Sequence, residues 1–173
     1  MMKYLTIIGL LLAVTAHNTA ASSQEYLKHR SAFFNQMANK REFSAFVASD
    51  FEGNILKMSS NFSPTPTSCD LKIIATEALG KRSCPSKDVV SLGGRTYKCR
   101  EIPNNDTPIE HIVYEQLDNR GRIMRKGNTF LCSKITDAVM CAIYTTNDRT
   151  KWNVAMEALV KGGGYQLKMM YEW

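Results

Sequence analysis

Apolar and polar positions alternate with two different periods along the chain. Apolar side chains recur at near-helical spacing over residues 22–40, 69–79 and 148–160, and each of these stretches predicts one helix. The segments between them are shorter, are richer in residues typical of strands, and end at turns that contain glycine or asparagine. Helices scattered among short, turn-connected strands favour an α+β fold with a mostly antiparallel, twisted sheet and about three helices.

The strand-like segments are spread over most of the chain. The strongest hairpin signal is residues 111–117, the turn 118–121 and residues 122–126. Two strands are also expected on either side of the turn at Asp50–Gly53. Those two strands cover residues 43–48 and 54–60. The remaining predicted strands cover residues 89–90, 95–101, 130–132 and 138–145, and the alternating tail 165–173.

The first 21 residues contain the three parts of a secretory signal peptide. Lys3 supplies a positive charge, Leu5–Val14 an apolar run, and Thr19–Ala21 the small residues that precede a cleavage site. The apolar run is shorter than the roughly 20 residues that a membrane-spanning helix needs. We therefore expect a signal peptide over residues 1–21 and a single secreted α+β domain over residues 22–173, with no membrane contact after cleavage.

All five cysteines lie after the predicted cleavage site, where an oxidising compartment makes disulfides the expected state. An odd number leaves at least one without a partner in the chain. The sequence leaves the pairing open, and we favour Cys99–Cys132 because it would join the ends of the most strand-like region. No two cysteines have the close spacing of a zinc site, so neither a metal nor a cofactor is expected. The disulfide candidates are Cys69, Cys84, Cys99, Cys132 and Cys141.

The chain carries a formal charge of +6 and has a pI near 9.1, which permits an anionic partner without requiring one. Its basic residues gather in the predicted hairpin and in the strand before it. They are candidates for contact with RNA or with a partner protein. The alternative is a solvated strand face, because acidic residues share the same span. The seven residues are Arg95, Lys98, Arg100, Arg120, Arg122, Arg125 and Lys126.

A catalytic site could combine Glu101 with His111, because a carboxylate and an imidazole are the smallest set of side chains that can accept and donate a proton near neutral pH. Glu110 and Glu115 lie close to them in sequence. A regular strand would place the backbones of His111 and Glu115 about 13 Å apart, too far for a direct hydrogen bond. An exposed histidine in a strand is therefore the simpler interpretation.

Residues 111–132 resemble the closing hairpin of the small fungal guanyl-preferring ribonucleases, and Glu101-Ile102-Pro103 is similar to the Glu-x-Pro that carries the catalytic base of that family. This chain has His111 where the family has an arginine, and Arg125 or Lys126 where the family has its catalytic histidine. An arginine cannot donate the proton that the leaving oxygen needs. The resemblance therefore implies a ribonuclease-like scaffold whose catalytic set has been replaced.

A scaffold of this kind is similar to the secreted effectors of powdery mildew fungi, whose aromatic-x-Cys motif is matched by Tyr97-Lys98-Cys99 and Phe130-Leu131-Cys132. The implied function is a secreted, non-catalytic effector of a pathogen that binds a host protein or RNA, with delivery into a host cell as a further step. Two alternatives stay open. One is an active secreted ribonuclease that uses Glu101 and His111, with Arg125 at the position of the family's histidine. The other is a bacterial periplasmic or extracellular binding protein.

Overall fold

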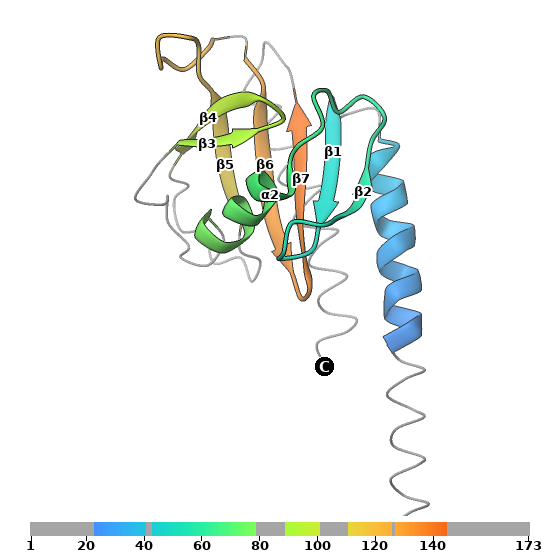
Figure 1. Ribbon diagram of the computed structural model, residues 1–173. Coiled ribbons are helices and arrows are strands. Elements are labelled where there is room, and N and C mark those ends of the chain that lie inside the picture. Colours follow the sequence, from blue (N-terminus) through green and yellow to red (C-terminus); the bar gives the residue numbers. More distant parts are fainter. Residues whose placement is uncertain (1–22, 41–42, 79–88, 101–110, 126, 145–173) are drawn as a thin grey trace, which may run out of the picture. The chain divides into compact units, whose positions relative to one another are not determined.

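Seven antiparallel strands form one sheet in the order β2-β1-β7-β6-β5-β4-β3 (Figure 1). The computed structural model describes residues 23–40, 43–78, 89–100, 111–125 and 127–144, with the side chains of Arg100 and His111 excepted. The strands are β1 (Ala45–Ser49), β2 (Ile55–Met58), β3 (Val89–Leu92), β4 (Arg95–Arg100), β5 (His111–Gln116), β6 (Thr129–Ile135) and β7 (Ala138–Tyr144).

Every pairing in the sheet but one joins strands that follow each other in the chain. The exception is β1 with β7, which pair over five residues, from Ala45 opposite Ile143 to Ser49 opposite Val139. This pairing joins the early hairpin of β1 and β2 to the later run of strands from β3 to β7. The sheet is therefore continuous only because two segments far apart in sequence meet there.

One face of the sheet carries an apolar cluster that is completed by a short helix. Tyr97, Tyr114 and Phe130 lie on this face, and all three are almost fully buried. Helix α2 (Ser68–Ile73) continues as a π-helical turn η1 (Ile74–Ala78), and its apolar stripe joins the same cluster. That stripe is Leu71, Ile74 and Ala75, as its spacing in the sequence indicates.

Helix α2 begins at a capping box. The Thr67 hydroxyl accepts a hydrogen bond from the backbone N–H of Asp70 at 3.1 Å, and the Thr67 backbone N–H donates to the Asp70 carboxylate at 3.1 Å. Both donors would otherwise lack a partner in the first helical turn. The cap therefore fixes the start of α2 directly after the proline-containing segment 63–67.

The opposite face of the sheet is buried as well. Phe46, Leu131 and Met140 lie on it, and each is fully excluded from solvent. The chain divides into two units after Phe33, and the sheet belongs to the second unit. The helix over residues 23–38 runs across this division. Within the second unit, the ring of Phe34 lies 6.4 Å from the ring of Phe46.

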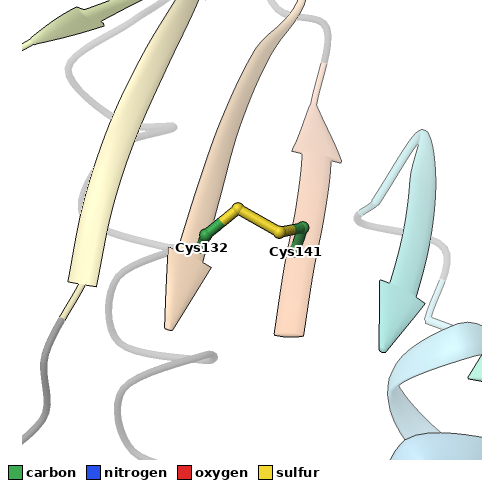
Figure 2. Close-up of a disulfide and its surroundings, with 2 residues drawn as sticks. All are labelled: Cys132 and Cys141. Atoms are coloured by element: carbon green, nitrogen blue, oxygen red, sulfur yellow. A yellow bond between two sulfur atoms is a disulfide. The ribbon is translucent and has the colours of Figure 1, made fainter. Parts of the chain in front are cut away.

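A disulfide joins Cys132 of β6 to Cys141 of β7, with their Cα atoms 4.2 Å apart (Figure 2). The two residues are direct register partners in adjacent strands and are buried. The predicted pairing of Cys99 with Cys132 is wrong, because β5 lies between β4 and β6. Two strand spacings separate such residues by about 10 Å, whereas a disulfide needs Cα atoms within roughly 7 Å. Cys99 is disulfide-bonded elsewhere, and Cys69 is free and exposed.

The predicted hairpin between residues 111–117 and 122–126 is half right. The turn is confirmed, since the Gly121 N–H donates to the carbonyl of Asp118 at 2.9 Å. The strand that pairs with β5, however, is β6, with Tyr114 opposite Phe130. Residues 122–126 are rich in arginine and lysine and cannot fill the buried faces, so a single bridge between Leu117 and Ile123 is all that remains of the predicted pairing.

Most other predicted elements are confirmed where they can be compared. The helix expected over 22–40 is observed over 23–38, and the helix expected over 69–79 is α2 with η1. The described residues thus contain two helices on an antiparallel α+β sheet, against the three predicted. The third predicted helix (148–160), the tail strand (165–173) and the predicted signal peptide lie outside the described residues. In the part of the chain that is described, no helix is long and apolar enough to cross a membrane.

Replacing Cys132 and Cys141 together by alanine is expected to lower the free energy of unfolding by about 2–3 kcal/mol. The disulfide closes a short loop, with a sequence separation of 9, and restricts the unfolded chain accordingly. Urea denaturation under non-reducing conditions measures the change. Cys69→Ser is the matched control, because that thiol is exposed and unpaired, and its unfolding midpoint should not move. Equal midpoints for the double variant and the control would contradict the assignment.

Candidate partner surface and cavity at one end of the sheet

The loop over residues 117–128 extends beyond the sheet from the end of β5 to the start of β6 (Figure 1). Asp118 organises it. One carboxylate oxygen accepts the backbone N–H groups of Arg120 at 2.8 Å and Arg122 at 2.9 Å, and the other accepts Nε of Arg122 at 3.2 Å. The loop therefore has a defined shape although its residues are largely exposed.

The same bonds change the acidity of Asp118. The backbone N–H of Arg122 lowers the pKa of this carboxyl below its ordinary value of 3.8, with smaller contributions from Arg120 and from the Arg122 side chain. Such a group stabilises the loop while it is ionised, and the stabilisation is lost as the pH falls through the lowered pKa. At neutral pH the Asp118 carboxylate therefore holds the loop in the form described.

The structure separates the seven predicted basic residues into groups with different surroundings. Arg122 forms an ion pair with Asp118, with Nη2 and Oδ2 3.2 Å apart, and so stabilises the loop. Arg120 and Arg125 are exposed on that loop. Arg95 begins β4 at the same end of the sheet, where Thr96 O accepts the N–H of Leu117 at 2.9 Å.

The other three basic residues do not belong to this group. Lys98 lies on the opposite face of β4 from Tyr97, directly across from Glu115 in the register with β5. Arg100 ends β4, about 16 Å along the strand from Arg95. Lys126 lies outside the described residues. The basic surface at the sheet end therefore consists of Arg120 and Arg125, with Arg95 nearby, and we call it the arginine loop surface.

A cavity of about 290 Å³ opens at this same end of the sheet. It is lined by the start of β1, the segment after β2, the turn between β3 and β4, the first half of β4, the residue before β6 and the end of β7. Its apolar lining includes Phe62, Leu92 and Ile143. The polar lining residues are Ser44, Asn61, Ser63, Arg95, Tyr97 and Asn128.

Tyr97 is the central polar group of the cavity. Burial raises the pKa of its phenol, while the charge of Arg95 and hydrogen bonds from Arg95 and Asn128 act in the opposite direction. Its ring stands edge-on to Phe130 with 4.7 Å between centroids, and Phe130 stacks on Tyr114 at 4.5 Å. The three aromatic rings hold the phenol in place, and the phenol stays protonated at neutral pH.

The wall of the cavity is closed by a tight contact between two turns. Gly93, in the turn between β3 and β4, has φ +56°, and a Cβ there would lie 2.5 Å from the carbonyl oxygen of Pro64. The side-chain amide of Asn61 donates a hydrogen bond to the backbone carbonyl of Ser44, and this bond connects the segment after β2 to the residue before β1. The cavity is therefore built by segments that contact each other without a ligand.

The catalytic residues of the alternative ribonuclease interpretation are not brought together. His111 begins β5, whereas Arg125 lies in the loop beyond its other end, so the length of the strand, about 16 Å, separates them. Glu101 lies outside the described residues. No group of histidine, cysteine, aspartate or glutamate side chains arranged to hold a metal ion occurs in the described ranges.

Comparison with solved structures identifies the fold. LokiProfilin2, in a complex with rabbit actin, is 15% identical with a TM-score of 0.52, and the match covers 79% of this chain and 92% of that one. LokiProfilin1, also with rabbit actin, is 13% identical with a TM-score of 0.51, over 80% and 93% of the two chains. Mouse profilin IIa, in complex with a double repeat from the FH1 domain of mDia1, is 6% identical with a TM-score of 0.51 and the same coverage.

These similarities show that the fold is that of profilins. No protein-family model matches the sequence, and no curated protein matches it significantly. The predicted likeness to fungal ribonucleases and to powdery mildew effectors is therefore wrong. The hairpin on which it depended forms only as a turn with a single bridge, because β5 pairs with β6, and the similar structures are profilins. The active-ribonuclease alternative loses its basis with it, and the bacterial binding-protein alternative, which assumed no ribonuclease ancestry, is not supported either, because the similar structures are profilins.

The sequence does not reveal the cavity, because the residues that line it come from distant segments. Asn61, Tyr97 and Asn128 are far apart in the chain and share no motif. The one available signal was Tyr97 alternating with Arg95 and Cys99, which places these three side chains on one face of a strand. That pattern identifies a face, but it does not show which loops close over its end.

Gly93→Ala should disturb the cavity wall, and Gly121→Ala is its matched control. Both positions have a positive φ, but a Cβ at Gly121 would meet no atom within 4 Å, whereas one at Gly93 would overlap Pro64. We expect each substitution to cost about 1 kcal/mol for the left-handed backbone, and Gly93→Ala to cost at least about 1 kcal/mol more. Thermal unfolding of both variants measures the difference, and equal losses would contradict the described contact.

Proposed function

We propose that this chain is a profilin-like protein-binding domain whose partner is actin. The observation that carries the proposal is the extent of the fold match, which covers at least 79% of this chain and 92% of each of the three similar profilins. Two of those were solved with rabbit actin and one with a repeat from an FH1 domain. A shared fold alone does not establish a function, so the proposal also needs a suitable surface.

The arginine loop surface supplies such a candidate. Arg120 and Arg125 are exposed, and Asp118 holds the backbone between Asp118 and Arg122 in a defined shape. A surface that is ordered before binding loses less conformational entropy when a partner docks. Two exposed guanidinium groups favour an acidic patch on the partner and accelerate association at low ionic strength.

An actin-binding experiment tests the proposal. The purified chain is titrated into fluorescently labelled monomeric actin, and we expect saturable binding that weakens as salt concentration rises. Arg125→Glu is expected to weaken binding about three- to tenfold, mainly through a slower association rate, because it reverses a charge at the edge of the contact. Absence of actin binding, or binding to RNA in its place, would contradict the proposal.

The matched control for this experiment is Lys72→Glu. It changes the net charge by the same amount, but Lys72 is exposed on helix α2, away from the arginine loop surface. Its affinity for actin should stay within about twofold of the unsubstituted chain. An equal loss in both variants would show that net charge, and not this loop, determines binding.

We further propose that the chain is exported from the cytosol. The Cys132–Cys141 disulfide and the disulfide-bonded Cys99 support export, because disulfides persist in oxidising compartments and are rare in the cytosol. The charged start, apolar run and small-residue exit of residues 1–21 are the further support. The proposal concerns the compartment alone and does not restore the effector interpretation.

Expression of the full chain in a secreting host tests export. The protein is expected in the medium with its amino terminus near Ser22, as determined by mass spectrometry of the intact chain. Replacing two residues of the apolar run, Leu11→Arg with Leu12→Arg, should abolish secretion, because charge in the apolar region prevents recognition as a signal. Retention of the unsubstituted chain inside the cell with residues 1–21 attached would contradict export.

A further inference from the structure

The cavity at the end of the sheet carries one charged side chain among the residues that line it. Arg95, an exposed residue at the start of β4, supplies a guanidinium, and the other ten lining residues are neutral. No lining residue is acidic, so this positive charge is not neutralised within the cavity. A site with this charge balance attracts an anion.

The lining also determines what kind of anion would fit. A volume of about 290 Å³ is at the lower end of the range for small-molecule sites, which limits the ligand to a small molecule. Phe62, Leu92 and Ile143 are the large apolar residues of the lining, and each exposes only a small part of its surface there. The ligand should therefore combine a negative charge with a compact apolar body.

A single guanidinium matches a singly charged, planar group best. The two oxygens of a carboxylate fit the fork of N–H donors that an arginine presents. The Arg95 guanidinium acts on the Tyr97 phenol through its charge and its side chain, and a guanidinium carries five N–H donors, enough to bind a carboxylate as well. A phosphate would bring about two negative charges against this one cation, and the cavity offers no second one.

The cavity does not need to be formed by the ligand. The contact between Gly93 and Pro64 closes one side, and the Asn61 amide bonded to the Ser44 carbonyl ties another. Tyr97 is held by its edge-on contact with Phe130. A site with these fixed walls loses little entropy on binding.

We infer that this cavity binds a small organic carboxylate, with the carboxylate at Arg95 and Tyr97 and the apolar body against Phe62, Leu92 and Ile143. The buried phenol of Tyr97 remains protonated, so it can donate a hydrogen bond to one carboxylate oxygen. This site goes beyond the proposed actin contact, since it depends on different residues. Arg120 and Arg125 do not line the cavity.

Titration with benzoate tests the inference on the protein purified after expression of the full chain. Nuclear magnetic resonance of the ¹⁵N-labelled protein should show saturable shifts at the amides of Gly93, Arg95 and Tyr97. We expect benzoate to bind at millimolar concentration or below, and benzamide, which has the same shape without the charge, to bind at least tenfold more weakly. No shift at these amides up to about 20 mM benzoate, or equal binding of benzamide, would overturn the inference.

Substitutions locate the binding. Arg95→Gln should weaken benzoate binding at least tenfold, because it removes the charge, and Tyr97→Phe should weaken it several-fold while keeping the ring contacts. Arg125→Gln is the matched control and should change the affinity by less than twofold. An equal effect of Arg95→Gln and Arg125→Gln would overturn the inference. The comparison of benzoate with benzamide on the unsubstituted chain remains decisive if a variant does not fold.

The outcome is separable from that of the actin experiment. Loss of actin binding in Arg125→Glu with benzoate binding intact would support both sites independently. Benzoate binding without any actin binding would sustain the cavity and reject the proposed function. Actin binding without any benzoate binding would reject the proposed carboxylate site and leave the proposed function standing.

Discussion

The pairing of β1 with β7 is the interaction on which the rest of the structure depends. It joins residues nearly a hundred positions apart, and all its five residue pairs lie where both faces of the sheet are buried. Closing so long a loop costs conformational entropy, and the burial of these residue pairs must offset that cost. The local hairpins do not offset it, because their contacts form without closing the long loop. The Cys132–Cys141 bond lies in the adjacent pair of strands and restricts the unfolded chain near this junction.

The same topology decides which residues can act together. Antiparallel order brings the start of β1, β4 and β6 and the end of β5 and β7 to one end of the sheet, where the loop over 117–128 and the cavity lie next to each other. It places His111 at the other end of β5. The ribonuclease interpretation required residues from both ends in one site, and strand length alone forbids that.

Arginines that are equivalent in the sequence have different roles in the structure. All three are exposed, but Arg122 is paired with Asp118, Arg125 lies on the loop, and Arg95 lines a cavity beside a buried tyrosine. Net charge therefore describes the partner class only coarsely. The local partners of each guanidinium decide whether it stabilises the loop, contacts a protein or binds a small anion.

Local pattern determined much of the fold. The stripe of Leu71, Ile74 and Ala75 predicted helix α2, and the glycine turns predicted the hairpins, because each of these signals lies within a few consecutive residues. What the sequence could not determine was which strands become neighbours. Three features show this: β5 pairs with β6 and not with residues 122–126, β5 lies between Cys99 and Cys132, and the cavity forms at Tyr97. All three depend on the burial of residues that are far apart in the chain, and that burial is complete only when the whole sheet is assembled.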